Sequence, residues 1–130
     1  MKPSLLFYLL MFSSIFSFLK GADVPSVAPA EAAARLKSGN AVLIDVREPD
    51  EWAGGVAAPA VLLSLSELRG DRKAWKPFLE KNRDKELLLY CRSGNRSGQA
   101  AAILAKEGFK IANVGGFSAW KSAGLPTRKP

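Results

Sequence analysis

The only cysteine of this 130-residue chain lies in a stretch whose residue types and spacing could do chemistry. It begins the run CRSGNRSG at residues 91–98, which follows four apolar residues and precedes an Ala- and Leu-rich run. The apolar run is typical of a strand buried on both faces, and residues 99–106, followed by Gly108, predict a helix. Backbone N–H groups gather where a strand leads into a helix, and with the helix dipole they form an anion site. We therefore predict that Cys91 is activated, with a pKa below the roughly 8.5 of a free thiol.

A lone cysteine is more often an inert, buried small hydrophobe, and that alternative has to be weighed against a reactive thiol. The polar, basic run that follows Cys91 favours the reactive interpretation. Ser97 fits a hydroxyl in a helix turn, although it could also donate a hydrogen bond to the sulfur. Because the chain has one cysteine and no histidine, it excludes an internal disulfide, a thiolate zinc site, His-ligated metals, Cys-His proteases and Ser-His-Asp hydrolases.

The rest of the chain predicts the elements that must position this loop. Short apolar runs that read as buried strands alternate with stretches of helical character, which favours one α/β domain with a mostly parallel central sheet and helices on both faces. Ligands bind such sheets outside the carboxyl ends of the strands. Cys91 lies at one such end, while Asp45 and Arg47 lie at another, where we expect them to brace the loops. The expected strands are residues 24–27 at an edge, then 41–46, 61–63, 87–90 and 110–114, and the expected helices include 29–37, 48–52, 99–106 and 117–121.

The first 22 residues have the three parts of a secretory signal. Lys2 gives the positive start, an apolar stretch runs from Leu5 to Leu19, and small residues follow at Gly21 and Ala22. The apolar stretch is about 15 residues, shorter than the roughly 20 of a membrane-spanning helix. We expect a signal peptide at residues 1–22, a domain at 23–130 and a periplasmic or otherwise exported protein. Membrane contact is expected only through this segment, if it is not cleaved.

The formal net charge of +7 favours small anions as ligands. Basic residues are scattered among acidic ones, and no basic patch is interleaved with aromatic residues. We therefore expect no binding of nucleic acid.

Several separated motifs resemble the rhodanese (sulfurtransferase) homology domain. LIDVREPDEW at residues 43–52 resembles the first motif of the family, and CRSGNRS at 91–97 resembles its active-site loop. The closing motif is matched by Gly108-Phe109, by NVGG at 113–116, and by Trp120 with GLP at 124–126. The family usually shows Gly-His-Ile where this chain has Gly55-Val56-Ala57, a departure that concerns the shape of a loop and not the nucleophile. A stand-alone, exported member is similar to the small periplasmic rhodaneses of bacteria.

The resemblance implies a persulfide mechanism that needs no metal and no organic cofactor. Cys91 would take a sulfane sulfur from a small anionic donor such as thiosulfate and pass it to a thiophilic acceptor such as cyanide or a thiol. A protein acceptor is compatible with the same chemistry. Backbone N–H groups and the two arginines of the loop would hold the anions, and Gly94 would allow the tight curl. The expected substrate-binding residues are Arg92, Ser93, Gly94, Asn95 and Arg96.

Two other functions use the same features. The active-site loop of cysteine phosphatases is similar, with five residues between its Cys and its Arg. In this chain only four residues separate Cys91 from Arg96. The shorter loop is better sized for one sulfur atom than for a tetrahedral phosphate. The alternative from another class is a non-catalytic module that binds an anion or a protein through the same fold, because fold alone does not establish activity.

Overall fold

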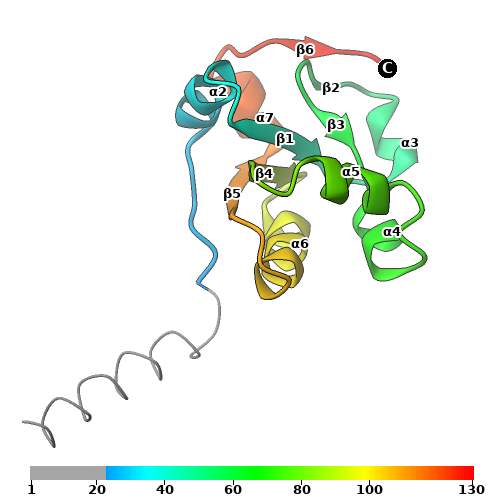
Figure 1. Cartoon of the computed structure of the whole chain (residues 1–130). Coiled ribbons are helices and arrows are strands. Elements are labelled where there is room, and N and C mark those ends of the chain that lie inside the picture. The colour runs from blue at the N-terminus through cyan, green and yellow to red at the C-terminus, as the bar shows by residue number, and fades with distance from the viewer. Residues whose placement is uncertain (1–22) are drawn as a thin grey trace, which may run out of the picture.

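A four-stranded parallel sheet forms the centre of the structure, a computed structural model that describes residues 23–130 (Figure 1). The predicted signal segment lies outside the described residues. In the described part, no helix combines the length and the apolar character needed to cross a membrane. The strand order is β3-β1-β4-β5, with bounds β1 Ala41–Asp45, β3 Val61–Leu62, β4 Glu86–Cys91 and β5 Ile111–Gly116.

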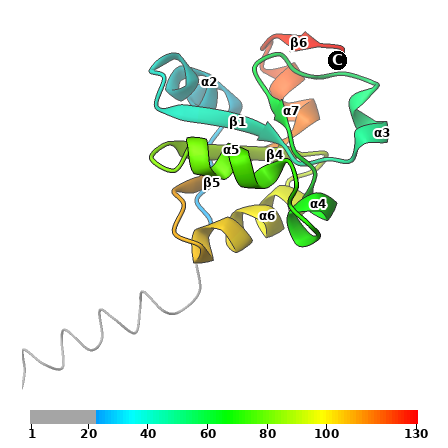
Figure 2. The same cartoon turned by 45° about the vertical axis from the view of Figure 1, so that its right-hand side comes forward.

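Helices cover both faces of this sheet, as the alternation of apolar runs and helical stretches predicts (Figures 1 and 2). On one face lie α2 (Pro29–Lys37) and α7 (Phe117–Ser122). On the other lie α4 (Leu65–Arg69), α5 (Trp75–Lys81) and α6 (Asn95–Lys106). The short helix α3 (Pro49–Trp52) follows β1 on the side of the molecule that carries β3. The expected fold class is therefore confirmed.

After Glu86, the central strand β4 is made of apolar and aromatic residues and Cys91, because both of its faces are buried. Leu87, Leu89 and Cys91 belong to the core beneath α4, α5 and α6. Leu88 and Tyr90 belong to the core beneath α2 and α7. Burying a leucine side chain contributes roughly 1.5–3 kcal/mol. Cys91 is thus carried by a central strand that is paired on both sides and buried on both faces.

A second, two-stranded antiparallel pair fastens the end of the chain and was not predicted. It joins β2 (Val56–Ala57) to β6 (Thr127–Arg128). The Arg128 guanidinium donates to the carbonyl oxygens of Ala58 and Ala60, at 2.9 and 2.8 Å. Val56, at the position where the family usually has histidine, is fully buried in β2.

Three sequence expectations need correction. Helix α6 begins at Asn95, four residues before the predicted start, because Gly94 alone supplies the change of direction. The glycine pair Gly115-Gly116, for which the sequence predicts a turn, instead ends β5, where the pairing register with β4 shifts by one residue. The edge strand expected at residues 24–27 is reduced to one parallel bridge, between Ser26 and Asn113.

Candidate active site

The connection between β4 and α6 is only three residues long, Arg92, Ser93 and Gly94. Gly94 has a φ of +97°, a conformation that side-chain-bearing residues rarely adopt. A Cβ atom there would also lie 3.3 Å from Cα of Gly115. This geometry turns the Gly94 N–H back toward the strand, where it donates to Sγ of Cys91 at 3.0 Å.

The end of β5 packs directly against this loop. Gly116 has an extended backbone, and a Cβ atom there would lie 2.3 Å from the carbonyl oxygen of Arg92. Such a contact is far shorter than real Cβ atoms make, so no larger residue fits without moving the loop. The loop that follows Cys91 therefore packs against the backbone of β5.

The Cys91 sulfur lies in a buried, polar environment. The residue has no exposed surface. Burial alone would raise the pKa of the thiol. Hydrogen bonds from the Ser97 hydroxyl, 3.4 Å from Sγ, and from the N–H groups of Ser97, Ser93 and Gly94 outweigh it, and the pKa is lowered below its ordinary value. The site favours a sulfur anion.

Asn113 on β5 connects several parts of the loop through one side-chain amide. Its Nδ2 donates to the Gly94 carbonyl at 2.9 Å. Its Oδ1 accepts from the N–H of Gly115 at 3.0 Å and from the Ser97 hydroxyl at 2.7 Å. These partners fix the orientation of the amide, because its oxygen faces two donors and its nitrogen faces an acceptor.

Arg96, in the first turn of α6, forms a bidentate ion pair with Glu51 of α3. Nη1 and Nη2 lie 2.6 and 2.8 Å from Oε1 and Oε2. The hydrogen bond from Arg96 lowers the pKa of Glu51 to about 2, so the carboxylate is charged at neutral pH. The same hydrogen bond raises the pKa of Arg96, and the charge of Cys91 adds to that increase.

The segment that carries Glu51 is anchored by a buried ion pair at the end of β1. Arg47 Nη2 lies 2.7 Å from Oδ2 of Asp45 and also donates to the Gly55 carbonyl at 2.8 Å. Trp52 Nε1 donates to Oδ1 of the same carboxylate at 3.2 Å. The expectation that Asp45 and Arg47 brace the loops is therefore confirmed.

The five residues predicted to bind substrate follow Cys91 in the loop and the first turn of α6, and their exposure and contacts differ. Arg92, Ser93 and Asn95 are exposed, and Gly94 is half-buried. The Arg92 guanidinium makes no side-chain hydrogen bond or ion pair to the residues that the structure describes, whereas Arg96 is engaged by Glu51. Sequence reasoning did not identify Glu51 or Asn113 as site residues. Both residues lie in motifs that resemble the family, Glu51 at residues 43–52 and Asn113 at 113–116, but neither motif indicates that its side chain contacts the Cys91 loop or the start of α6.

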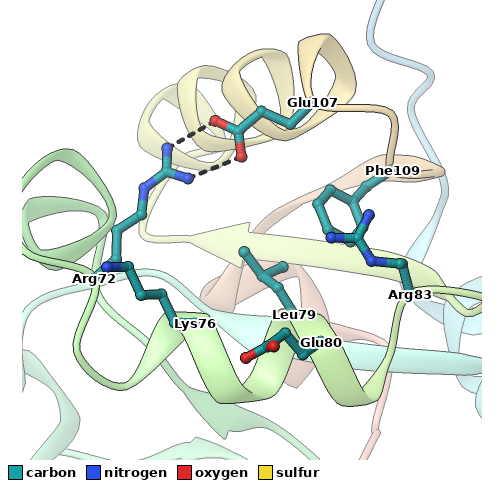
Figure 3. Close-up of a pocket in the computed structure, with 7 residues that line it drawn as sticks. All are labelled: Arg72, Lys76, Leu79, Glu80, Arg83, Glu107 and Phe109. Carbon is teal, nitrogen blue, oxygen red and sulfur yellow. Dashed lines mark hydrogen bonds and ion pairs between the residues drawn. The ribbon is translucent and has the colours of Figure 1, made fainter.

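A separate hollow of about 410 Å³ lies between α5 and α6 (Figure 3). Arg72 and Glu107 form a bidentate pair on one side of it, and the Arg83 guanidinium lies over the Phe109 ring on the other. This hollow contains no nucleophile and does not adjoin the Cys91 loop. The candidate active site is the loop at the carboxyl end of β4.

Comparisons of sequence and of structure with known proteins point to the same family. Residues 28–123 match the rhodanese-like domain family. A sulfurtransferase of Allochromatium vinosum is 37% identical over 91 residues, which cover 68% of this chain and 79% of that protein. An uncharacterized protein of Synechocystis sp. is 42% identical over 90 residues, but the match spans only 47% of its length. The crystal structure of a rhodanese-related protein from Thermoplasma volcanium has a TM-score of 0.68 at 31% identity, over 82% of this chain and 99% of that one.

The chain belongs to the rhodanese-like domain family. The resemblance in the motifs at residues 43–52, 91–97 and 108–126 is thereby confirmed. The family and the names of its relatives support a role of the sulfurtransferase type.

Proposed function

We propose that the protein transfers a sulfane sulfur from thiosulfate, or a similar donor, through a persulfide on Cys91 to a thiophilic acceptor such as cyanide or a thiol. The observation that carries the proposal is the environment of Sγ. One hydroxyl and three backbone N–H groups face the sulfur and lower its pKa in spite of complete burial. That arrangement stabilises the thiolate needed to attack, and it stabilises the persulfide anion that forms.

The chemistry takes two displacements at sulfur. The Cys91 thiolate attacks the outer sulfur of thiosulfate, the sulfur–sulfur bond of the donor breaks, and sulfite leaves with the electron pair. The acceptor then attacks the outer sulfur of the persulfide, which gives thiocyanate with cyanide and regenerates the thiolate. No external oxidant or reductant enters the cycle. Each step forms one bond to sulfur and breaks one.

The loop supplies the groups that hold the anions. The N–H groups of Ser93 and Gly94 point at the sulfur, and the exposed guanidinium of Arg92 is available to the oxygen atoms of the donor. Asn95 continues the same backbone curl at the start of α6. Arg96 lies in the first turn of α6, where its guanidinium is paired with Glu51.

The deciding experiment is the intact mass of the purified protein before and after incubation with thiosulfate. We expect a gain of one sulfur atom that cyanide removes with release of thiocyanate. Cys91→Ser is the matched control, since it replaces only the sulfur atom by oxygen and cannot form a persulfide. If the wild-type protein shows no mass gain with any sulfane donor but still binds thiosulfate or sulfite, the non-catalytic anion-binding module replaces this proposal.

The location of the protein remains a proposal from the sequence. We propose that residues 1–22 direct export, on the basis of Lys2 and the apolar stretch from Leu5 to Leu19. Expression in a bacterial host followed by fractionation and N-terminal sequencing tests it. Recovery of the full-length chain in the cytoplasm would contradict it.

A further inference from the structure

The Arg96–Glu51 pair changes the charge of the site from what the loop sequence suggests. The loop contains two arginines, and both would attract an anionic donor if their charges were free. In the structure, one of them faces a carboxylate through two hydrogen bonds of 2.6 and 2.8 Å. The two side chains are 30% and 26% exposed, so solvent screens the pair only in part.

Glu51 is held in this position independently of Arg96. Its Oε1 also accepts the N–H of Glu48 at 3.0 Å, as one half of a capping box at the start of α3. Glu48 in turn accepts hydrogen bonds from the hydroxyl and N–H of Ser66, which ties α3 to α4. The carboxylate is therefore placed at the loop by its own helix and is not merely recruited by the guanidinium.

A fixed carboxylate that is paired with Arg96 affects donors according to their charge. It cancels the attraction that Arg96 would exert on a negative ligand, and this loss grows with the number of negative charges on the ligand. Arg92 then remains as the loop guanidinium without an ion pair to the described residues. A dianion such as thiosulfate loses the most electrostatic attraction to the site, a monoanion loses less, and a neutral donor loses none.

We propose that Glu51 is a specificity-determining residue that selects sulfur donors by charge, so that the site favours sulfane donors with one negative charge or none over dianionic thiosulfate. Organic persulfides and thiosulfonates are donors of this class. With a thiosulfonate, the Cys91 thiolate attacks the terminal sulfur, the sulfur–sulfur bond breaks, and a sulfinate leaves with the electron pair. The inference rests on the proposed function and narrows its donor.

Thiosulfate and benzenethiosulfonate form a matched pair of probes, because both present a terminal sulfur bonded to an oxidised sulfur and they differ in charge. Glu51→Gln removes the negative charge and keeps an oxygen that can accept the Glu48 N–H. We expect kcat/KM for thiosulfate to rise at least about fivefold, mainly through KM, and kcat/KM for benzenethiosulfonate to rise by a smaller factor. In the double variant with Arg96→Gln, both charges of the pair are gone, and we expect the donor preference to return to that of the wild type.

Two variants with the same change in net charge serve as controls. Asp50→Asn removes an exposed carboxylate from the residue next to Glu51, and Glu80→Gln removes an exposed one on α5, in the separate hollow (Figure 3). We expect neither to change the ratio of the two kcat/KM values by more than about twofold. An unchanged ratio in Glu51→Gln, or an equal change in Asp50→Asn, would overturn the proposal.

A binding measurement separates this inference from the proposed function. In a Cys91→Ser background no sulfur is transferred, and calorimetric titration with thiosulfate reports affinity alone. Glu51→Gln should tighten binding at least about fivefold in that background. If binding tightens while the wild-type thiol accepts no sulfur from either donor, charge selection holds and the transferase proposal fails. If sulfur is transferred but affinity and donor preference do not change, the charge-selection proposal fails.

Discussion

The Ser97 hydroxyl donates to Oδ1 of Asn113 over 2.7 Å while lying 3.4 Å from Sγ of Cys91. A hydroxyl has one proton, so the amide oxygen and the sulfur compete for it. With a neutral thiol, the proton stays on the side of Asn113 and the hydroxyl oxygen can accept the S–H. With a thiolate or a persulfide anion, the charge draws the proton toward sulfur. Ser97 thus adapts to the charge of Cys91.

Replacement of Ser97 by alanine should raise the pKa of Cys91. Hydrogen bonds to charged groups are worth about 1.5–3 kcal/mol, and one pKa unit corresponds to roughly 1.4 kcal/mol. Since Asn113 competes for the proton, we expect an increase of about one unit, at the lower end of that range. The rate of alkylation by iodoacetamide as a function of pH measures the pKa, because only the thiolate reacts.

The control for this measurement is Ser93→Ala. Ser93 acts on the sulfur through its backbone N–H, which the substitution retains. The alkylation profile of Ser93→Ala should therefore match the wild type, with its midpoint below the roughly 8.5 of a free thiol. Equal shifts in the two variants would show that the Ser97 hydroxyl has no special role.

Replacement of Gly116 by alanine should displace the Cys91 loop. The new Cβ would lie 2.3 Å from the Arg92 carbonyl oxygen, so the loop must move away from β5. Overpacking of this kind costs about 1–3 kcal/mol. We expect a lower free energy of unfolding together with a higher pKa of Cys91, because the N–H groups of the displaced loop no longer donate hydrogen bonds to the sulfur.

Gly54→Ala is the matched control, since a Cβ atom at Gly54 would meet its nearest neighbour at an ordinary 3.8 Å. Urea unfolding and the alkylation profile together check both variants. A Gly116→Ala protein with the stability and thiol pKa of the wild type would contradict the close approach of loop and strand.

Much of the fold could be predicted because its signals are local. The bounds of α2 follow from Pro29 at its start, and the apolar run of β4 reflects burial on both faces. The position of Cys91 at the carboxyl end of a central strand follows from the same pattern. Elements without a strong local signal were missed, as with β2 and β6, which are two residues each and depend on pairing across the chain.

The functional partners of the loop could not be predicted because they are set by tertiary contacts. Arg96 and Glu51 are 45 residues apart, and nothing near either residue indicates that α3 faces α6. Asn113 interacts with Gly94 and Ser97 across the pairing of β4 and β5, just before the register of the two strands shifts, and no local pattern indicates these contacts. The early start of α6 has a similar origin, since Gly94 supplies in one residue the turn that a longer loop was expected to make.

Loss of Asp45 should destabilise the protein strongly. The carboxylate is fully buried, and its removal by Asp45→Ala leaves the buried Arg47 guanidinium without its ion-pair partner. Removing one member of a buried ion pair costs about 3–5 kcal/mol. Glu31→Ala is the control, because Glu31 is largely exposed and Arg35 keeps its contact with Glu86, so the loss should be below about 1 kcal/mol. Equal losses in urea unfolding would contradict the bracing role.

The Arg96–Glu51 pair should give the protein an acid-dependent part of its stability. The pKa of Glu51 falls from an ordinary 4.5 to about 2 in the folded protein. A carboxylate with a depressed pKa stabilises the fold above its unfolded pKa, and this contribution is lost as the pH falls through the folded value. The difference in unfolding free energy between the wild type and Glu51→Gln should therefore be constant near neutral pH. Between pH 4.5 and about 2, the wild type should lose stability relative to Glu51→Gln.

The sign and the pH window together make this measurement specific to the pair. Glu80→Gln removes an exposed carboxylate for which no ion pair is formed with the described residues, so its difference from the wild type should stay close to zero over the same range. Urea unfolding at a series of pH values, followed by tryptophan fluorescence, gives both differences. A wild-type advantage over Glu51→Gln that persists unchanged down to pH 2 would mean that the carboxylate contributes through packing and not through its charge. In that case Arg96 would be free to act on anions, and the charge argument for donor selection would lose its basis.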